Sequence, residues 1–209
     1  MCGIAGFFGQ GDSETLKRMT DVIAHRGPDA DGFYTNADAG IYLGHRRLSI
    51  LDITGGVQPM HDHSDRYIIT FNGEIYNHRE LRAELAPRGA IFTTADSDTE
   101  TLLEAYKVWG AEMLPRLNGM FAFCIYDTKT NKAFIARDRF GKKPIFYTHQ
   151  RGTFAFASEL TSIQQHQNIT CAQSRESLKK YFAYGYIPAP HSLYEHVYKL
   201  PGGHYMHVD

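Results

Sequence analysis

The sequence predicts an α+β domain in which antiparallel sheets and helices form stacked layers. Strand-like runs come in consecutive pairs joined by short turns, and a few amphipathic helical patterns lie among them. Strands connected by such short turns pair antiparallel, which argues against a parallel sheet with helical crossovers. The 209 residues, 43% of them hydrophobic, are enough for one domain with a sizeable core.

The predicted strands are short apolar or alternating runs bounded by turn residues. Residues 120–127 and 132–138 flank the sequence TKTN and form one hairpin. Residues 144–149 and 153–158 flank a turn at 150–152 and form a second hairpin. Further strand-like runs are found at 4–9, 40–51 and 66–74.

Helical patterns are found at 15–25, 78–86 and 98–110. The third begins with a capping box formed by Ser97 and Glu100 and ends at Gly110. Its apolar face, predicted to pack in the core, is made of Leu102, Tyr106, Trp109 and Met113.

A weaker boundary near residues 166–173 precedes another helix-like stretch and a proline-rich segment. We therefore expect a main domain over residues 1–165 and a C-terminal extension over residues 166–209.

The composition excludes several classes of function. A formal net charge of −1 does not favour binding to nucleic acid or to acidic membranes. No apolar run approaches the roughly 18–20 residues of a membrane-spanning helix, and the N-terminus lacks the pattern of a signal peptide. Three cysteines, an odd and sparse set, fit a reducing compartment. We expect a cytoplasmic protein without a membrane partner.

Cys2 stands directly behind the initiator methionine. Removal of Met1 would expose its α-amine, which has an ordinary pKa of about 7.7–8 and can act as a general base near neutral pH. The thiol, with an ordinary pKa of about 8.5, could then act as a nucleophile that carries its own base. Considered alone, an accidental cysteine is the more common explanation.

Three other features could complete such a site. Asn72-Gly73, at the end of a strand, could donate hydrogen bonds to an oxyanion, although Asn-Gly is more often a hairpin turn. Arg47 could bind a carboxylate, and the glycine pair at 55–56 would permit a lid over residues 47–58. Asp98 could bind a cation, although an acid in the first turn of a helix is usually solvated.

Taken together, these stretches resemble the class II glutamine amidotransferases. The start, CGIAGFFG, is similar to all branches of that superfamily, and seven further segments resemble the asparagine synthetase branch. These segments are HRGPD (25–29), RLSILD (47–52), NGEIYN (72–77), SDTE (97–100), GMFAFCIYD (119–127), ARDRFGKKPIFY (136–147) and ASEL (157–160). The resemblance runs from residue 1 to about 165, and the tail at 181–206 looks like the segment that leads into a synthetase domain.

The resemblance implies the four-layer αββα sandwich of N-terminal-nucleophile hydrolases and a glutaminase reaction that converts L-glutamine to L-glutamate and ammonia. It makes Cys2 the nucleophile and its amine the base, with the Asn72 side chain and the Gly73 N–H as the oxyanion hole. Arg47 would bind the α-carboxylate of glutamine and Asp98 its α-ammonium. Nearby would lie Glu74 and the backbone of Leu48 and Ile50, while Arg26 and Gly27 would shape the wall near Cys2.

The resemblance also implies a synthetase domain, in cis or as a separate subunit, which would amidate an activated carboxylate with this ammonia. Its SGGxDS pyrophosphate loop does not occur in this sequence, so ATP and Mg²⁺ are expected only in that domain and this chain needs no cofactor. His61-Asp62-His63 lacks a third ligand, so no metal is expected. Neither Cys124 nor Cys171 is expected to be catalytic.

Other interpretations remain open. The chain could be a catalytically silent module that docks to an ammonia-using synthetase, or a related amidohydrolase acting on another amide. The chain could also form a homodimer.

Overall fold

The structure, a computed structural model, describes residues 1–49 and 56–209. Within these ranges the strands form two antiparallel sheets. The first sheet contains β1 (Gly3–Phe8), β2 (Ala30–Asn36), β3 (Ile41–Arg47), β8 (Phe146–Gln150), β9 (Thr153–Ala157) and β10 (Val197–Lys199). The second contains β4 (Met60–His61), β5 (Tyr67–Ile75), β6 (Gly119–Asp127), β7 (Lys132–Arg137) and β11 (Tyr205–Val208). Their spatial orders are β10-β8-β9-β1-β3-β2 and β11-β7-β6-β5-β4.

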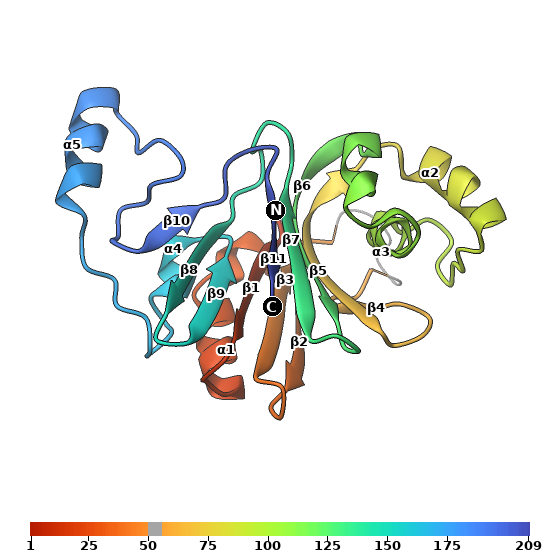
Figure 1. The fold of residues 1–209 in the computed structure, drawn as a ribbon, viewed down its shortest axis with the longest axis horizontal. Coiled ribbons are helices and arrows are strands. Elements are labelled where there is room, and N and C mark those ends of the chain that lie inside the picture. Colours follow the sequence, from red (N-terminus) through yellow and green to blue (C-terminus); the bar gives the residue numbers. More distant parts are fainter. Residues whose placement is uncertain (50–55) are drawn as a thin grey trace.

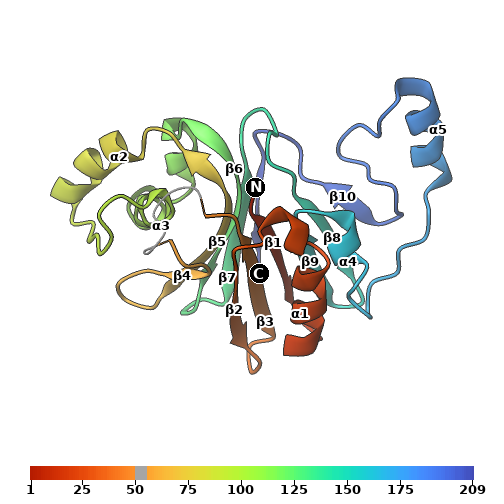
Figure 2. The same ribbon diagram turned by 180° about the vertical axis from the view of Figure 1, so that it is seen from behind.

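Helices cover the outer faces of both sheets (Figures 1 and 2). The helices are α1 (Ser13–Asp21), α2 (His78–Leu85), α3 (Asp98–Trp109), α4 (Leu160–Ile163) and α5 (Arg175–Tyr184). α1 packs on β1 and β3, and α4 on β9, whereas α3 packs on β5 and on α2. This layering is the expected αββα sandwich, and the predicted fold class is confirmed.

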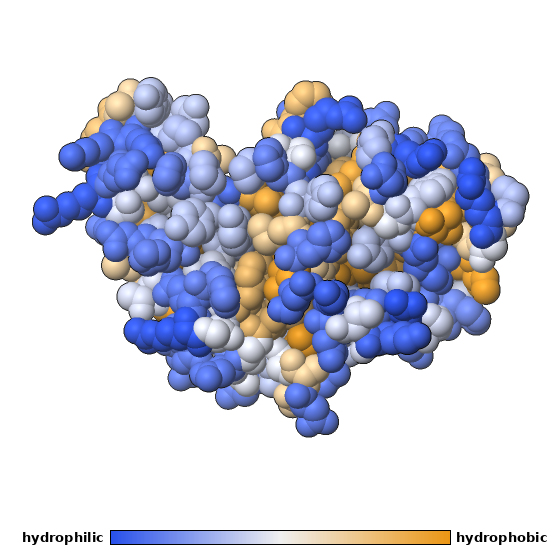
Figure 3. Space-filling view, viewed as in Figure 1, coloured by the Kyte–Doolittle hydropathy of each residue, from blue (hydrophilic) through white to orange (hydrophobic). Residues whose placement is uncertain are grey.

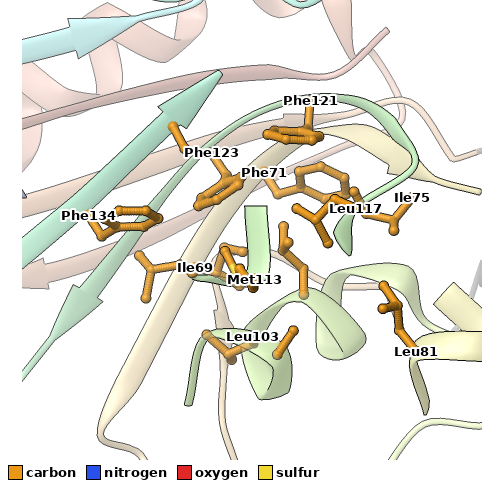
Figure 4. Close-up of a cluster of buried hydrophobic side chains, with 14 of the residues drawn as sticks. Ile69, Phe71, Ile75, Leu81, Leu103, Met113, Leu117, Phe121, Phe123 and Phe134 are labelled. Atoms are coloured by element: carbon orange, nitrogen blue, oxygen red, sulfur yellow. The ribbon is translucent and has the colours of Figure 1, made fainter. Parts of the chain in front are cut away.

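The alternation of side chains along β6 explains why two sheets stack between helices. Phe121, Phe123 and Ile125 point to the helical side, where they join the cluster shown in Figure 4 with residues of α3. Cys124 and Tyr126 point the other way, into the core between the two sheets. A strand that buries both faces must lie between two apolar layers.

The predicted strands and the helices at 78–86 and 98–110 are confirmed, with small shifts at their ends. The strand expected at 40–51 already ends at Arg47, and its residues 50–51 lie outside the described residues. The helix expected at 15–25 is too long, because α1 ends at Asp21 and a separate 3-10 turn covers Ala24–Arg26. β2 was not predicted: it lies at the edge of its sheet and is partly exposed along its whole length, so it lacks a strong apolar pattern.

The C-terminal extension supplies an edge strand to each sheet. β10 pairs with β8, and β11 pairs with β7. α5 stands away from both sheets (Figure 1). The face seen in Figure 3 is hydrophilic over most of its outer parts, with apolar residues gathered near its centre. Among the described residues, no helix is long and apolar enough to cross a bilayer.

Candidate active site

Cys2 lies directly before β1, which runs inside the first sheet between β9 and β3. The register pairs Gly3 with Arg46, and its continuation by one residue sets Cys2 opposite Arg47. The Leu48 N–H donates a hydrogen bond to the Cys2 Sγ at 3.4 Å, and the Leu48 carbonyl oxygen lies 3.7 Å from the same sulfur. The thiol is half-buried, so it is held beside the end of β3 and is still accessible.

Arg26 holds the main chain of Cys2. Its Nε donates to the Cys2 carbonyl oxygen at 3.0 Å, and its Nη1 forms an ion pair with Glu159 at 2.9 Å. A Cβ on the neighbouring Gly27 would lie 2.4 Å from the carbonyl carbon and oxygen of Arg46, so the turn requires glycine. Arg26 thus contacts Cys2 directly, whereas Gly27 lies against Arg46, and their expected role in shaping the wall near Cys2 stays a prediction.

Asn72 is buried on β5 with an unsatisfied side chain. It is 1% exposed, and within residues 1–49 and 56–209 neither its Nδ2 nor its Oδ1 has a hydrogen-bond partner. A buried polar group left without partners costs about 1–3 kcal/mol, and such groups in native structures often serve a ligand. A Cβ on Gly73 would lie 2.3 Å from the Met120 carbonyl oxygen, so only glycine fits beside it.

The backbone of β5 explains how Gly73 can act as a donor. The Phe71 N–H donates to Gln58 Oε1 at 2.7 Å, and the Ile75 N–H donates to Asp98 Oδ2 at 3.0 Å. Alternate residues of a strand direct their N–H groups to the same side, so the Gly73 N–H faces the side of Gln58 and Asp98. Both of those residues line the pocket that also contains Cys2.

Asp98 opens α3, where Ser97 is the N-cap and accepts the Glu100 N–H at 3.3 Å. Burial raises the pKa of Asp98 above its ordinary value of 3.8, although the hydrogen bond from Ile75 opposes this effect. Because burial destabilises the charged form of Asp98, a cationic ligand would stabilise this carboxylate.

The capping box predicted at Ser97 and Glu100 is only half present. The Glu100 carboxylate does not return to the Ser97 N–H; it accepts hydrogen bonds from Thr93 and Thr94 and pairs with Arg82 at 2.8 Å. This network ties the segment before α3 to α2, and it therefore positions Asp98.

Two hydrogen bonds between the sheets keep the two halves of the site together. The Thr70 hydroxyl donates to the Gly44 carbonyl oxygen at 3.2 Å, and His45 Nε2 lies 3.1 Å from the Phe71 carbonyl oxygen. Burial lowers the pKa of His45 to about 4, so the ring is neutral and donates from Nε2. β3, which carries Arg47, is thus joined to β5, which carries Asn72.

One pocket brings the predicted residues together: it is lined by Cys2, Arg47, Leu48, Asn72, Gly73, Glu74 and Asp98. Ile50, the other predicted residue, lies outside the described residues, as do residues 51–55 of the predicted lid at 47–58. The pocket therefore combines a thiol, hydrogen-bond donors and fixed charges of both signs.

The same pocket contains residues to which the sequence analysis gave no role, among them Gln58, Thr99, Met120 and Lys143. Gln58 is buried and holds β5 through Phe71, while its Nε2 lies 3.4 Å from the Thr99 hydroxyl. No spacing rule identifies Gln58. Lys143 belongs to the segment at 136–147 that carries the resemblance, and this was a signal that could have identified it.

The rejected candidates lie elsewhere. His61 contacts Asp65, and Asp62 pairs with Lys107 at 2.9 Å. Although burial opposes ionisation of Asp62, hydrogen bonds from Ser64, the Tyr67 backbone and Lys107 lower its pKa to about 2. In the part of the chain that the structure describes, no three His, Cys, Asp or Glu side chains could share a metal ion. That the chain needs no metal stays a prediction.

The other two cysteines are outside the pocket. Cys124 is fully buried and Cys171 is half-buried, and burial raises the pKa of both thiols. Both are therefore poor nucleophiles.

The arrangement is suited to acyl transfer on a small zwitterion. An accessible thiol lies in one pocket with an unsatisfied amide and a backbone N–H, which could stabilise an oxyanion. Arg47 and Asp98 provide one fixed cation and one fixed anion in the same pocket.

Comparison with known proteins gave matches over most of the chain. The family model described as "Glutamine amidotransferase domain" matches residues 1–209. Asparagine synthetase [glutamine-hydrolyzing] 1 of Bacillus subtilis is 41% identical over 210 residues, covering 97% of this chain and 33% of that protein. Asparagine synthetase B [glutamine-hydrolyzing] of Escherichia coli is 37% identical over 169 residues, covering 78% of this chain and 30% of that protein. The chain thus spans about a third of the length of the curated relatives it matches.

Among solved structures, glutamine phosphoribosylpyrophosphate amidotransferase from B. subtilis matches with a TM-score of 0.65 at 22% identity, covering 78% of this chain and 43% of that one. At this level of identity the likeness concerns the fold.

Proposed function

Because the chain belongs to the glutamine amidotransferase domain family, we propose that it hydrolyses L-glutamine to L-glutamate and ammonia through a thioester on Cys2. The observation that carries the proposal is the buried Asn72 amide, which has no partner among the described residues and lines the same pocket as the Cys2 thiol. A buried amide with no structural partner is what an oxyanion hole requires before substrate binds.

In the proposed reaction, the Cys2 thiolate attacks the side-chain amide carbon of glutamine after Met1 has been removed. Negative charge develops on the amide oxygen, where the Asn72 Nδ2–H and the Gly73 N–H can stabilise it. The α-amine of Cys2 takes the thiol proton and donates it to the departing ammonia. A water molecule then hydrolyses the thioester and releases L-glutamate.

Recognition of glutamine would depend on its two charges. Arg47 would bind the α-carboxylate and Asp98 the α-ammonium, with Glu74 and the backbone of Leu48 beside them. This pair of fixed charges supports an amino-acid substrate over a simple amide.

The chain would act with a synthetase domain, in cis or as a separate subunit, that uses ammonia to amidate an activated carboxylate. This part of the proposal is supported by the relatives named asparagine synthetase, of which this chain covers about a third. ATP and Mg²⁺ would bind in that domain. Free cysteines fit a cytoplasmic location.

Treatment with 6-diazo-5-oxo-L-norleucine, a reactive glutamine analogue, tests the proposed nucleophile. We expect one covalent adduct on Cys2 of the protein that lacks Met1, detected by mass spectrometry of the intact protein and its peptides. Protein that retains Met1 should stay unlabelled, because its nitrogen at Cys2 is an amide and cannot accept a proton. Processed protein without an adduct would contradict the proposal, and an adduct without glutamine turnover would favour a silent module or another amide substrate.

Glutamine binding is expected to weaken at acidic pH. Only the carboxylate form of Asp98 attracts the ammonium, and burial raises the pKa of Asp98 above 3.8. The carboxylate is therefore lost at a higher pH than in a solvated aspartate, and KM should rise as the pH falls through that pKa. In Asp98→Asn, KM should be high at every pH, by about tenfold to a hundredfold, because a charge-assisted hydrogen bond contributes about 1.5–3 kcal/mol.

Asp96→Asn is the matched control for this measurement. Asp96 is close to Asp98 in sequence but pairs with Arg79 and His78 and does not line the pocket. It should change KM and its pH profile far less than Asp98→Asn does. If Asp98→Asn kept the wild-type KM, the assignment of Asp98 to the ammonium would be wrong.

A further inference from the structure

Lys143 is a buried cationic residue in the pocket of Cys2 to which the proposed mechanism gives no role. It lies between β7 and β8, is 4% exposed, and lines the pocket together with Cys2, Glu74 and Met120. Lysine is almost never this deeply buried unless it is paired. Its neighbour Lys142, in the same loop, is exposed.

The loop that carries Lys143 is held rigidly by Asp138. The carboxylate of Asp138, itself 1% exposed, accepts the backbone N–H groups of Phe121, Lys142 and Lys143 at 3.1, 2.9 and 2.9 Å. Arg137 Nε donates to the Lys143 carbonyl oxygen at 2.7 Å. The backbone of Lys143 is thus fixed on both sides, and this fixes where its side chain enters the pocket.

The ammonium of Lys143 has no hydrogen bond or ion pair with any residue in the ranges 1–49 and 56–209. Burial lowers its pKa below 10.5, and Arg26 acts in the same direction. Cys2, Glu74 and Asp138 favour the charged form. Of these three groups, Cys2 and Glu74 line the pocket with it.

The charges around Cys2 come from several elements. The cations Arg26, Arg47 and Lys143 approach it from the 3-10 turn, the end of β3 and the loop before β8. The acids are Glu74 on β5 and Asp98 at the start of α3. Arg26 is engaged by Glu159 and by the Cys2 carbonyl oxygen. Lys143 differs from Arg26 in that its ammonium forms no hydrogen bond or ion pair among the described residues.

We propose that Lys143 is a positioning residue for the proposed glutaminase reaction, whose positive charge favours the thiolate form of Cys2 over the thiol. The inference rests on the proposed function for its biological meaning, but the thiolate can be measured without glutamine. A cation that lines the same pocket as a thiol at low solvent exposure stabilises the anion and so increases the fraction of reactive sulfur near neutral pH. The low exposure of Lys143 without an ion pair among the described residues is then explained by the charge that Cys2 acquires during the reaction.

The test is the pH dependence of Cys2 alkylation by iodoacetamide in the Met1-processed protein, followed at the peptide level by mass spectrometry. Lys143→Met removes the charge and keeps an unbranched side chain of similar length, so the fold should be retained. We expect the pH of half-maximal alkylation to rise by about one unit, as for the loss of a nearby opposite charge. The acid limb of kcat/KM for glutamine should shift in the same direction.

Two variants control the experiment. Lys142→Met removes the same charge from the exposed neighbour and should leave the alkylation profile at its wild-type position. Lys143→Arg keeps a cation and should lie nearer to wild type than Lys143→Met does. An unchanged profile in folded Lys143→Met, or an equal shift in Lys142→Met, would overturn the inference. If glutamine were not hydrolysed at all, the proposed function would fail while the alkylation profile still decided the role of Lys143.

Discussion

Replacing Cys2 with alanine is expected to reduce glutamine hydrolysis by at least about 10³-fold, because no other described residue that lines the pocket has a thiol to form the thioester. The fold should be retained, since the Cys2 side chain is half-buried and its polar contacts are long ones to the Leu48 backbone, at 3.4 and 3.7 Å. Ammonia release under saturating glutamine, together with the thermal midpoint, measures both effects.

Cys171→Ala is the matched control, because Cys171 is another half-buried free cysteine that lies outside the pocket. It should release ammonia at the wild-type rate. A Cys2→Ala protein that still hydrolysed glutamine at the wild-type rate would exclude the thioester mechanism.

Replacing Asn72 with leucine is expected to lower kcat without lowering the thermal midpoint. Loss of one oxyanion donor typically lowers kcat by about 10²–10³-fold. The thermal midpoint should stay the same or rise, because Asn72 is 1% exposed and its amide has no partner among the described residues, so leucine removes a buried unsatisfied group. Steady-state kinetics and thermal unfolding of the same preparation measure the two quantities.

Thr70→Val, on the same strand, is expected to affect stability more than activity. Thr70 is also buried, but its hydroxyl donates to the Gly44 carbonyl oxygen at 3.2 Å. Its loss should lower the free energy of unfolding by about 1 kcal/mol. It should lower kcat far less than Asn72→Leu does, because the hydrogen bond from His45 still joins the two sheets. If Asn72→Leu instead lost stability and kept its kcat, Asn72 would be a structural residue and the oxyanion hole would lie elsewhere.

Local patterns predicted most of the fold because its strands and helices have strong periodicity. β6 is a continuous apolar run with a turn sequence after it, and α3 has an N-cap at Ser97 and a terminating Gly110. The weak elements were missed or misplaced. β2 is partly exposed along its length, and the Ser97–Glu100 box formed only in part because Thr93, Thr94 and Arg82 compete for the Glu100 carboxylate.

The site residues also fall into two groups, those that a motif identified and those that only the structure revealed. Cys2, Arg47, Asn72, Gly73 and Asp98 were identified through motifs, and the structure places all five in one pocket. Gln58 and Lys143 were not identified, because their importance depends on burial and on which group each side chain contacts. A sequence pattern does not encode those quantities.

By itself, the sequence determined that a thiol follows Met1, that glycine stands beside Asn72, and that the chain folds as α+β layers, because these depend on residue identity and on short-range periodicity. The tertiary structure decided that Cys2 and Asn72 share a pocket, that Asn72 lacks a partner among the described residues, and that a buried lysine lies with them. These facts depend on strand register and on hydrogen bonds between the two sheets, such as that from His45 to the Phe71 carbonyl oxygen. Such contacts join residues far apart in the chain, and their energies are set only when both sheets are packed.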